Sequence, residues 1–227
     1  MYQLFIGNKN YSSWSMRPWV LMRGLGIAFE ERLMPFHLNH GEGDFKRFSP
    51  TGKVPCLVHG ELQVWDSLAI TEYLAERHPG VWPSLVPARA WARSAACEMH
   101  SGFGNLRNEC SMSVGVRIKL HRMSNALQAE LQRLDALWTE GLARFGGPFL
   151  AGASFSAVDA FYAPVASRIQ TYDLPLGAGA RGYASMLLQH PAVAQWVDAG
   201  IRETWRDVPH EKEIMASGEV LQDLRAR

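Results

Sequence analysis

GNKNYSSWSMRPWVLMRGLG, residues 7–26, joins a polar loop to an apolar helical pattern and decides how the chain begins to fold. The residues before it, YQLFI at 2–6, are β-prone and predict a strand that ends at the loop. The helical pattern starts near Trp19 and stops at two glycines. Hydroxyls crowd the boundary between loop and helix: Ser12, Ser13 and Ser15. They either cap the helix or hold an anion at the positive end of its dipole.

The segments that follow predict a small mixed sheet. FEERLMPF (29–36) reads as a second strand, and VPCLVHGELQVW (54–65) reads as a hairpin. DSLAITEYLAERHP (66–79) predicts a helix capped by Asp66 or Ser67. The first two strands are joined through a helix, so we expect them to be parallel, whereas the hairpin is antiparallel.

After residue 80 the pattern changes. The glycine and prolines of GVWPSLVPARAWAR (80–93) indicate a linker at 81–87 between an α/β domain at 1–80 and a second domain at 88–227. The second domain shows no strand signal in its sequence, and we predict it to be all helical. The helical patterns occupy residues 88–108, 124–145, 156–173 and 191–205.

Composition limits the function. Apolar residues make up 47% of the 227 residues and charged residues 20%, which is typical of a globular protein. A formal net charge of +1 gives no basic field for nucleic acid or an anionic membrane, and no apolar run is long enough to span a bilayer. The chain has an odd number of cysteines, and their spacing is not that of metal ligands: Cys56, Cys97 and Cys110. We therefore expect a protein of the reducing cytoplasm without a metal site.

Two short motifs suggest how the first domain binds a ligand. Pro55 cannot donate a hydrogen bond within the hairpin, so it belongs at an edge or turn. A cis bond before Pro55 would turn the backbone of Val54 toward a peptide lying alongside, although trans is the commoner state. Asp66 and Ser67 cap the next helix, and the same helix N-terminus can bind a carboxylate.

Four motifs in order, YSSWSMRPW (11–19), FSPTGKVPCL (48–57), DSLAITEYL (66–74) and GASFSAVDA (152–160), resemble the cytosolic glutathione transferases. The resemblance covers nearly the whole chain. It implies a thioredoxin-like N-terminal domain, a helical C-terminal domain and glutathione as co-substrate. It also implies that SFSAVDA is a structural helix-initiating box, in which Ser156 caps the helix and Asp159 reaches back.

The resemblance further implies which residues bind glutathione. The backbone of Val54, before a cis Pro55, would pair with the cysteinyl part. Asp66 and Ser67 would bind the γ-glutamyl carboxylate. Two further residues would lie near the glycyl end: Lys53 and His40.

The opening motif most resembles the zeta-like, maleylacetoacetate isomerase-like branch, in which Ser-Ser-Cys-Ser precedes an aromatic residue and an arginine. This alignment places Ser12 at the catalytic position, and Ser13, the next residue, is the second candidate. Lowering a thiol pKa by two units takes about 2.7 kcal/mol, which a hydroxyl and a helix dipole can supply. Tyr11 is the rival, but tyrosine-type classes place that residue at the end of the first strand.

Two departures from the branch matter. Trp14 replaces the motif cysteine, which argues against a mixed-disulfide mechanism and weakens the assignment of isomerase activity. Met16 replaces the motif aromatic residue. Trp14 would instead stack on an aromatic electrophile.

The electrophile pocket should also involve the second domain. The spacing of His100, Gly104 and Arg107 puts them on one helix face, which either lines the cleft, packs in a dimer or is a solvated polar stripe. Arg168 is a further candidate, about one turn earlier than the arginine of the zeta-like branch.

The leading functional hypothesis is therefore a glutathione transferase that conjugates the thiolate to a small, hydrophobic electrophile. A glutathione-dependent cis–trans isomerase of the maleylacetoacetate type is the enzymatic alternative. A non-catalytic binding protein that keeps the fold is the third. We also predict a homodimer, since a two-fold assembly is the commonest and a domain of about 80 residues buries a limited core.

Overall fold

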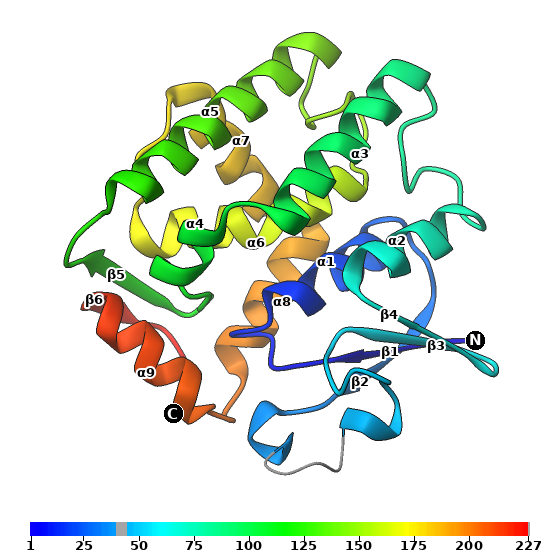
Figure 1. The fold of residues 1–227 in the computed structure, drawn as a ribbon, viewed down its shortest axis with the longest axis horizontal. Coiled ribbons are helices and arrows are strands. Elements are labelled where there is room, and N and C mark those ends of the chain that lie inside the picture. The colour runs from blue at the N-terminus through cyan, green and yellow to red at the C-terminus, as the bar shows by residue number, and fades with distance from the viewer. Residues whose placement is uncertain (40–44, 227) are drawn as a thin grey trace.

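The computed structural model describes residues 1–39 and 45–226 (Figure 1). The first half of the chain forms one four-stranded sheet with strand order β2-β1-β3-β4. Its elements are β1 (Tyr2–Ile6), α1 (Ser13–Gly24), β2 (Phe29–Leu33), the 3-10 turns η1 (Phe36–Asn39) and η2 (Phe45–Arg47), β3 (Cys56–His59), β4 (Leu62–Trp65) and α2 (Ser67–Ala75).

The strand pairing confirms the mixed sheet predicted from the sequence. β1 runs parallel to β2, with Tyr2 opposite Phe29, and antiparallel to β3. β3 and β4 form the predicted antiparallel hairpin, with Cys56 opposite Trp65. β4 is an edge strand of the sheet, because among residues 1–39 and 45–226 it pairs with β3 alone.

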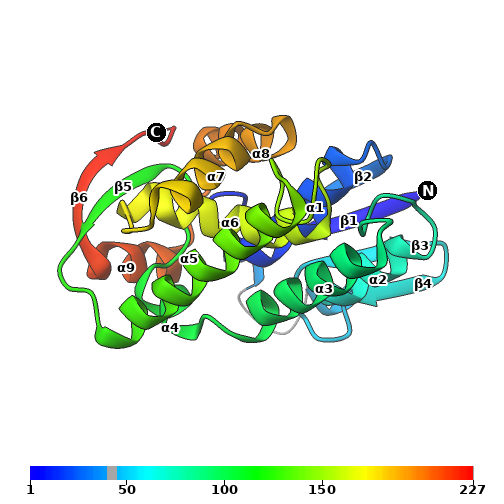
Figure 2. The same ribbon diagram turned by 90° about the horizontal axis from the view of Figure 1, so that it is seen from above.

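The second half is mostly helical. Its helices are α3 (Val86–Ser101), α4 (Gly104–Glu109), α5 (Asn125–Phe145), α6 (Ala157–Tyr172), α7 (Ala178–Gln189), α8 (Pro191–Arg202) and α9 (Val208–Ser217). α3 begins with a proline in its first turn, where the missing N–H is tolerated, so the end of the expected linker is already helical. Seen from above, α6 lies between α1 and the outer helices (Figure 2).

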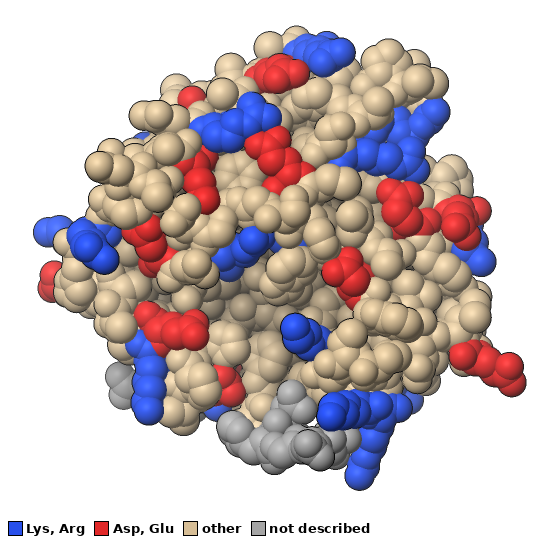
Figure 3. Space-filling view, in the orientation of Figure 1, with Lys and Arg blue, Asp and Glu red and all other residues tan. Residues whose placement is uncertain are grey.

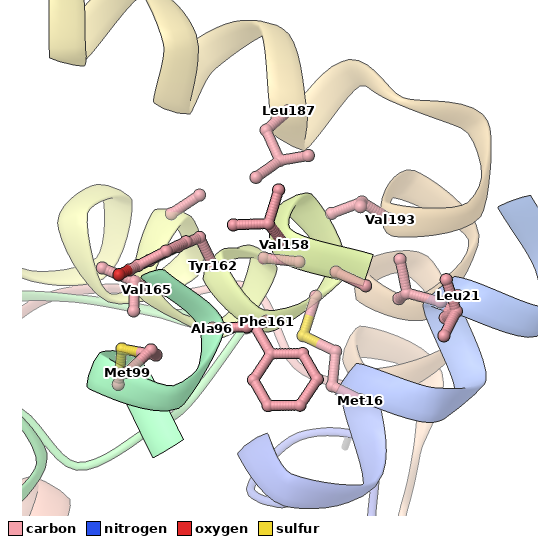
Figure 4. Close-up of a cluster of buried hydrophobic side chains, with 14 of the residues drawn as sticks. Met16, Leu21, Ala96, Met99, Val158, Phe161, Tyr162, Val165, Leu187 and Val193 are labelled. Atoms are coloured by element: carbon pink, nitrogen blue, oxygen red, sulfur yellow. The ribbon is translucent and has the colours of Figure 1, made fainter. Parts of the chain in front are cut away.

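The core joins the two halves through α1. Met16 and Leu21 of α1 are fully buried and point toward Phe161 and Val158 of α6 (Figure 4). α1 also contacts α8, β1 and α2. Because it is covered on nearly every side, α1 and its N-terminal serines are held in a fixed place between the sheet and the helices.

The structure corrects the prediction that the second domain has no strands. β5 (Val116–Leu120) pairs antiparallel with β6 (Gly218–Asp223), the last strand of the chain. The inward side chains of β5, Val116 and Ile118, are β-branched and alternate with exposed or half-buried ones, which is a strand pattern. Its partner lies about one hundred residues away in sequence, so local pattern gave no reason to expect a pair.

Three further elements differ from expectation. The helical pattern at 88–108 is interrupted: α3 ends at Ser101, and Phe103 adopts a left-handed conformation before α4. α7 lies between the helical patterns predicted at 156–173 and 191–205, where we expected no helix, and α9 was not predicted. Within the described residues no helix is both long and apolar enough to cross a membrane.

Candidate active site

The N-terminus of α1 carries the three serines of the opening motif. Ser12 is the N-cap: its Oγ accepts a hydrogen bond from the Ser15 amide at 3.3 Å and donates to Ser15 Oγ at 2.7 Å. Ser15 Oγ in turn accepts from the amide of Gly7 at 3.1 Å, which ties the helix to the end of β1. Ser13 Oγ accepts from Nη2 of Arg168 at 3.5 Å. No hydrogen bond in the described part of the chain uses the Ser13 hydroxyl as donor, so its hydrogen is free for a ligand.

Ser12 and Ser13 open onto a cavity of about 520 Å³ between the two halves. The face drawn in Figure 3 is hollowed at this place, between α4, α9 and the N-terminal half. The loop before α1, the η1–β3 region, α4 and the residues after it, α6 and α9 all contribute lining residues: Tyr11, Ser12, Ser13, Trp14, Phe36, Phe45, Gly52, Lys53, Val54, Arg107, Ser111, Met112, Arg168, His210 and Glu213.

The predicted backbone site lies at one wall of this cavity. The Val54–Pro55 peptide is cis, as the family resemblance implied. Val54 and the exposed Lys53 line the cavity, while Pro55 is buried and leads into β3. His40, the other residue predicted near the glycyl end, lies outside the described residues.

Two arginines give the cavity a positive wall. Arg168 is only 4% exposed and donates from Nε to the carbonyl of Cys110 at 2.8 Å. Burial lowers its pKa to about 10, so it remains charged at pH 7. Arg107 donates from Nη1 to the carbonyl of Met99 at 3.0 Å, and burial likewise lowers its pKa. Both cations, together with the α1 dipole, favour an anion near the serines.

Asp66 and Ser67 lie beside this cavity rather than in its wall. Asp66 caps α2 by accepting from the amides of Leu68 (2.8 Å) and Ala69 (3.4 Å), with a positive φ of 76°. Ser67 is fully buried and accepts from Nη1 of Arg17 at 3.3 Å. The predicted cap is therefore present, and a cation lies directly behind it.

Arg17 lies beside the cavity and was not among the residues predicted from the sequence. It is 1% exposed, and among the described residues its Nε has no hydrogen-bond partner. Its Cζ lies 4.2 Å from the centre of the Trp14 ring and 4.9 Å from that of Phe161. Burial, and then the charge of Arg168, lowers its pKa to about 9. The zeta-like motif includes an arginine at this place, which was the available signal.

Trp14, His100 and Arg107 meet at one point, although not as predicted. The break at Phe103 puts His100 on α3 and Arg107 on α4, so they do not share a helix face. Tertiary packing brings both to Trp14 instead. The His100 ring meets Trp14 edge-on at 5.2 Å, and the Arg107 Cζ lies 5.7 Å from the Trp14 ring centre. His100 Nε2 also lies 3.5 Å from Oδ2 of Asp66, which links the cap of α2 to Trp14.

The Tyr11 hydroxyl is already hydrogen-bonded within the protein. It donates to Oε1 of Glu211 on α9 at 2.5 Å. The pKa of the Tyr11 hydroxyl is raised to about 12. Burial is the larger cause, and the hydrogen bond to Glu211 is the second. The cavity residues of α9, His210 and Glu213, were not predicted, because nothing in the local sequence indicates that the end of the chain returns to the first loop. Among the described residues, no group of three or more His, Cys, Asp or Glu could hold a metal ion.

The comparisons with known proteins agree with this fold. A family model described as the glutathione S-transferase N-terminal domain matches residues 11–77, and one described as the C-terminal domain matches residues 115–199. Together they cover about two thirds of the chain. The chain belongs to the glutathione S-transferase family. This confirms the family and the fold class predicted from the sequence, and glutathione is the co-substrate that defines the family.

Similar proteins come from plants and bacteria. Glutathione S-transferase T2 of Arabidopsis thaliana is 26% identical over 187 residues, which is 75% of this chain but 29% of that protein, so the chain spans less than a third of that relative. A probable maleylacetoacetate isomerase of Vibrio cholerae is 28% identical over 186 residues, 74% of this chain and 83% of that protein. A glutathione transferase homologue from Burkholderia, solved with bound glutathione, shares the fold with a TM-score of 0.65, 22% identity and coverage of 88% and 97%.

Proposed function

We propose that the protein is a glutathione transferase whose reacting thiolate lies at the N-terminus of α1, in the cavity of about 520 Å³. The observation that carries this proposal is the meeting of the α1 serines with Val54, before the cis proline, and with two buried or half-buried arginines. A thiol near pKa 8.5 is a few per cent ionised at pH 7, and hydroxyl donors, cations and a helix dipole raise that fraction.

The hydrogen bonds of the two leading serines give them different roles in this proposal. Ser12 already donates to Ser15, so contacting sulfur would break that bond. Ser13 has a free hydrogen and is held by Arg168. This supports Ser13 as the primary donor to sulfur, with Ser12 as the cap that fixes the loop. The preference for Ser12 came from sequence alignment alone.

The γ-glutamyl end of glutathione would lie at Asp66 and Ser67. The buried Arg17 supports this placement, because it is an almost unpartnered cation directly behind Ser67. Lys53 and Val54 would bind the rest of the tripeptide. The small electrophile would then occupy the side of the cavity lined by Trp14, Arg107 and α9.

The test is a titration of the bound thiol by thiolate absorbance in wild type, Ser13→Ala and Ser12→Ala. Removing the sulfur donor should raise the apparent pKa of bound glutathione by about one unit or more, since one unit corresponds to about 1.4 kcal/mol. Tyr11→Phe is the matched control and should leave the curve unchanged, because the Tyr11 hydroxyl donates to Glu211. If neither serine variant shifts the curve, the thiolate does not lie at α1.

A second candidate function is glutathione-dependent cis–trans isomerisation. The observation that favours it is the pair of cavity arginines, Arg107 and Arg168, which suits a substrate carrying carboxylates. The relative from Vibrio cholerae carries the name of that activity. Two assays separate the two functions: turnover of a maleyl-type diketo acid indicates the isomerase, and turnover of 1-chloro-2,4-dinitrobenzene indicates the transferase. Glutathione binding without either turnover would indicate a binding protein.

Three assignments belong to the same proposal. The division into domains at 1–80 and 88–227 follows the change of sequence pattern. A cytoplasmic location follows the odd number of cysteines. A homodimer, joining the N-terminal domain of one chain to the helical domain of the other, follows the family resemblance.

A further inference from the structure

His210 reaches the cavity from the far end of the chain. It lies in the first turn of α9 and lines the cavity together with the serines. Its ring is stacked between two others: the Tyr11 centroid lies 5.2 Å away at an interplanar angle of 19°, and that of Phe36 lies 5.0 Å away at 20°. A side chain at Gly7 would collide with the Phe36 ring, so the glycine at the end of β1 allows this sandwich to form.

A buried carboxylate fixes which ring nitrogen of His210 carries the proton. Oδ2 of Asp207, the N-cap of α9, lies 2.5 Å from Nδ1 of His210. Asp207 is only 4% exposed. An ionised carboxylate can only accept, so Nδ1 keeps its hydrogen and Nε2 is the nitrogen that gains or loses a proton. Nε2 makes no hydrogen bond within the described part of the chain.

The other ionisable residues that line the cavity are poorly suited to moving a proton. Tyr11 is bonded to Glu211, and its pKa is raised to about 12 by burial. Arg107 and Arg168 are cations held by backbone carbonyls, and Lys53 is an exposed ammonium. Glu213 accepts from the Ser111 hydroxyl at 3.1 Å. Imidazole is the side chain that exchanges a proton near neutral pH, and here it has the carboxylate partner typical of a catalytic base.

The position of α9 is itself anchored on both sides. Glu211 accepts from Tyr11 and also pairs with Arg225, which follows β6. β6 continues directly from α9 and pairs with β5. The imidazole is therefore held over the cavity by the first loop, by η1 and by the terminal strand pair.

We propose that His210 is a catalytic proton carrier for addition reactions, in which glutathione adds to a carbon–carbon double bond conjugated to a carbonyl group. This proposal rests on the proposed transferase function. The imidazole takes the proton released when the thiol ionises. The sulfur then forms a bond to the β-carbon, the π electron pair moves toward the carbonyl, and Nε2–H returns the proton to the α-carbon. No further reactant is consumed.

The chemistry predicts a selective defect. Substitution on 1-chloro-2,4-dinitrobenzene releases chloride and needs no proton delivered to carbon, whereas addition to 4-phenyl-3-buten-2-one does. General acid–base catalysis contributes about 10²–10⁴-fold in rate. We therefore expect His210→Phe, which keeps the ring sandwich, to lower kcat/KM for the enone at least tenfold more than for the chlorobenzene.

Two further variants separate chemistry from structure. His210→Ala should regain enone addition when free imidazole is supplied, and the regain should be smaller for the chlorobenzene. Asp207→Asn still caps α9, since asparagine is as good an N-cap, and should show the same selective loss because Asp207 is a positioning residue. His121→Phe changes an exposed histidine that does not line the cavity and is the matched control for both reactions.

Each result has one interpretation. A selective loss in His210→Phe with imidazole rescue of His210→Ala supports the proposal. Equal losses for both electrophiles, no loss, or a wild type that conjugates the chlorobenzene but not the enone would overturn it while leaving the transferase function in place. A wild type that conjugates neither electrophile and leaves the glutathione thiol pKa unshifted would overturn the transferase function itself.

Discussion

At the scale of the residue, Arg17 places a poorly paired charge in the interior of the protein. Its charge is buried, has one hydrogen bond, to Ser67, and lies between two aromatic rings. Removing a cation from water is expensive unless it is paired, and no carboxylate bonds to Arg17 within the described residues. A pKa of about 9 keeps it charged at pH 7, so this cost is present under ordinary conditions. An anionic ligand at Ser67 would supply the missing partner.

We therefore predict that Arg17→Met weakens glutathione binding about tenfold or more while the protein keeps or gains stability. A charge-assisted hydrogen bond contributes about 1.5–3 kcal/mol, which sets the expected loss of affinity. Calorimetric titration with glutathione and a thermal melt measure the two effects. Arg77→Met, which changes an exposed arginine just beyond the C-terminal end of α2, is the control. Unchanged affinity for glutathione would mean that Arg17 has only a packing role.

At the scale of one element, the start of α6 depends on Asp159. This residue is fully buried, and its two oxygens accept four hydrogen bonds. Oδ2 accepts from the amide and hydroxyl of Ser156 at 3.0 and 3.3 Å. Oδ1 accepts from the Leu150 amide at 3.0 Å and the Tyr183 hydroxyl at 2.8 Å. The box predicted from the sequence is present, and it also ties α6 to α7 and to the preceding loop.

Asp159→Asn should destabilise the protein by about 3 kcal/mol. The new amide group would face two donors and leave them without an acceptor, and each unsatisfied buried donor costs about 1–3 kcal/mol. Burial raises the pKa of Asp159 to about 6, above its unfolded value near 4. Protonation of Asp159 therefore stabilises the native state of the wild type relative to the unfolded state. This contribution to the free energy of unfolding is lost as the pH rises through 6.

Asp159→Asn should accordingly lower the free energy of unfolding by more at pH 5 than at pH 7. Urea unfolding of both proteins at the two pH values measures it. Asp173→Asn changes an exposed aspartate at the other end of α6 and serves as the control. A cost below about 1 kcal/mol would contradict the role given to the four hydrogen bonds.

At the scale of the whole molecule, the N-terminal sheet has an edge strand with apolar residues. Within the described part of the chain β4 pairs only with β3, and it carries two exposed apolar side chains, Leu62 (53% exposed) and Trp65 (44% exposed). Exposed edge strands with apolar residues are contact sites for another chain. This edge lies next to Asp66, so an interface there would adjoin the predicted γ-glutamyl site.

We predict that the chain of 25.4 kDa sediments at equilibrium as a dimer of about twice that mass at micromolar concentration. Trp65→Glu should shift the equilibrium toward monomer, because it places a charge in the apolar part of the interface. Trp205→Glu changes a tryptophan of similar exposure on the other half and should leave the dimer intact. A wild-type species of 25 kDa would refute the dimer.

Local sequence determined most of the N-terminal half. The β-prone residues of β1, the hydroxyl-rich start of α1 and the hairpin turn each depend on neighbours within a few residues, so their patterns correctly predicted the parallel β1–β2 pair and the antiparallel β3–β4 hairpin. The cap at Asp66 was predictable for the same reason. The family resemblance added the cis proline and the box at Ser156 and Asp159, and it supplied the proposed glutathione site.

Tertiary structure alone decided the rest. The β5–β6 pair joins segments about one hundred residues apart, and α9 brings His210 to Tyr11 across almost the whole chain. His100 and Arg107 meet at Trp14 only because the helix breaks at Phe103. Hydrogen bonding and burial between distant segments are not encoded in any local period, because each side chain's partner is chosen by how whole elements pack. The sequence by itself therefore determined the class of protein, and the packing decided which side chains line the cavity between the two halves.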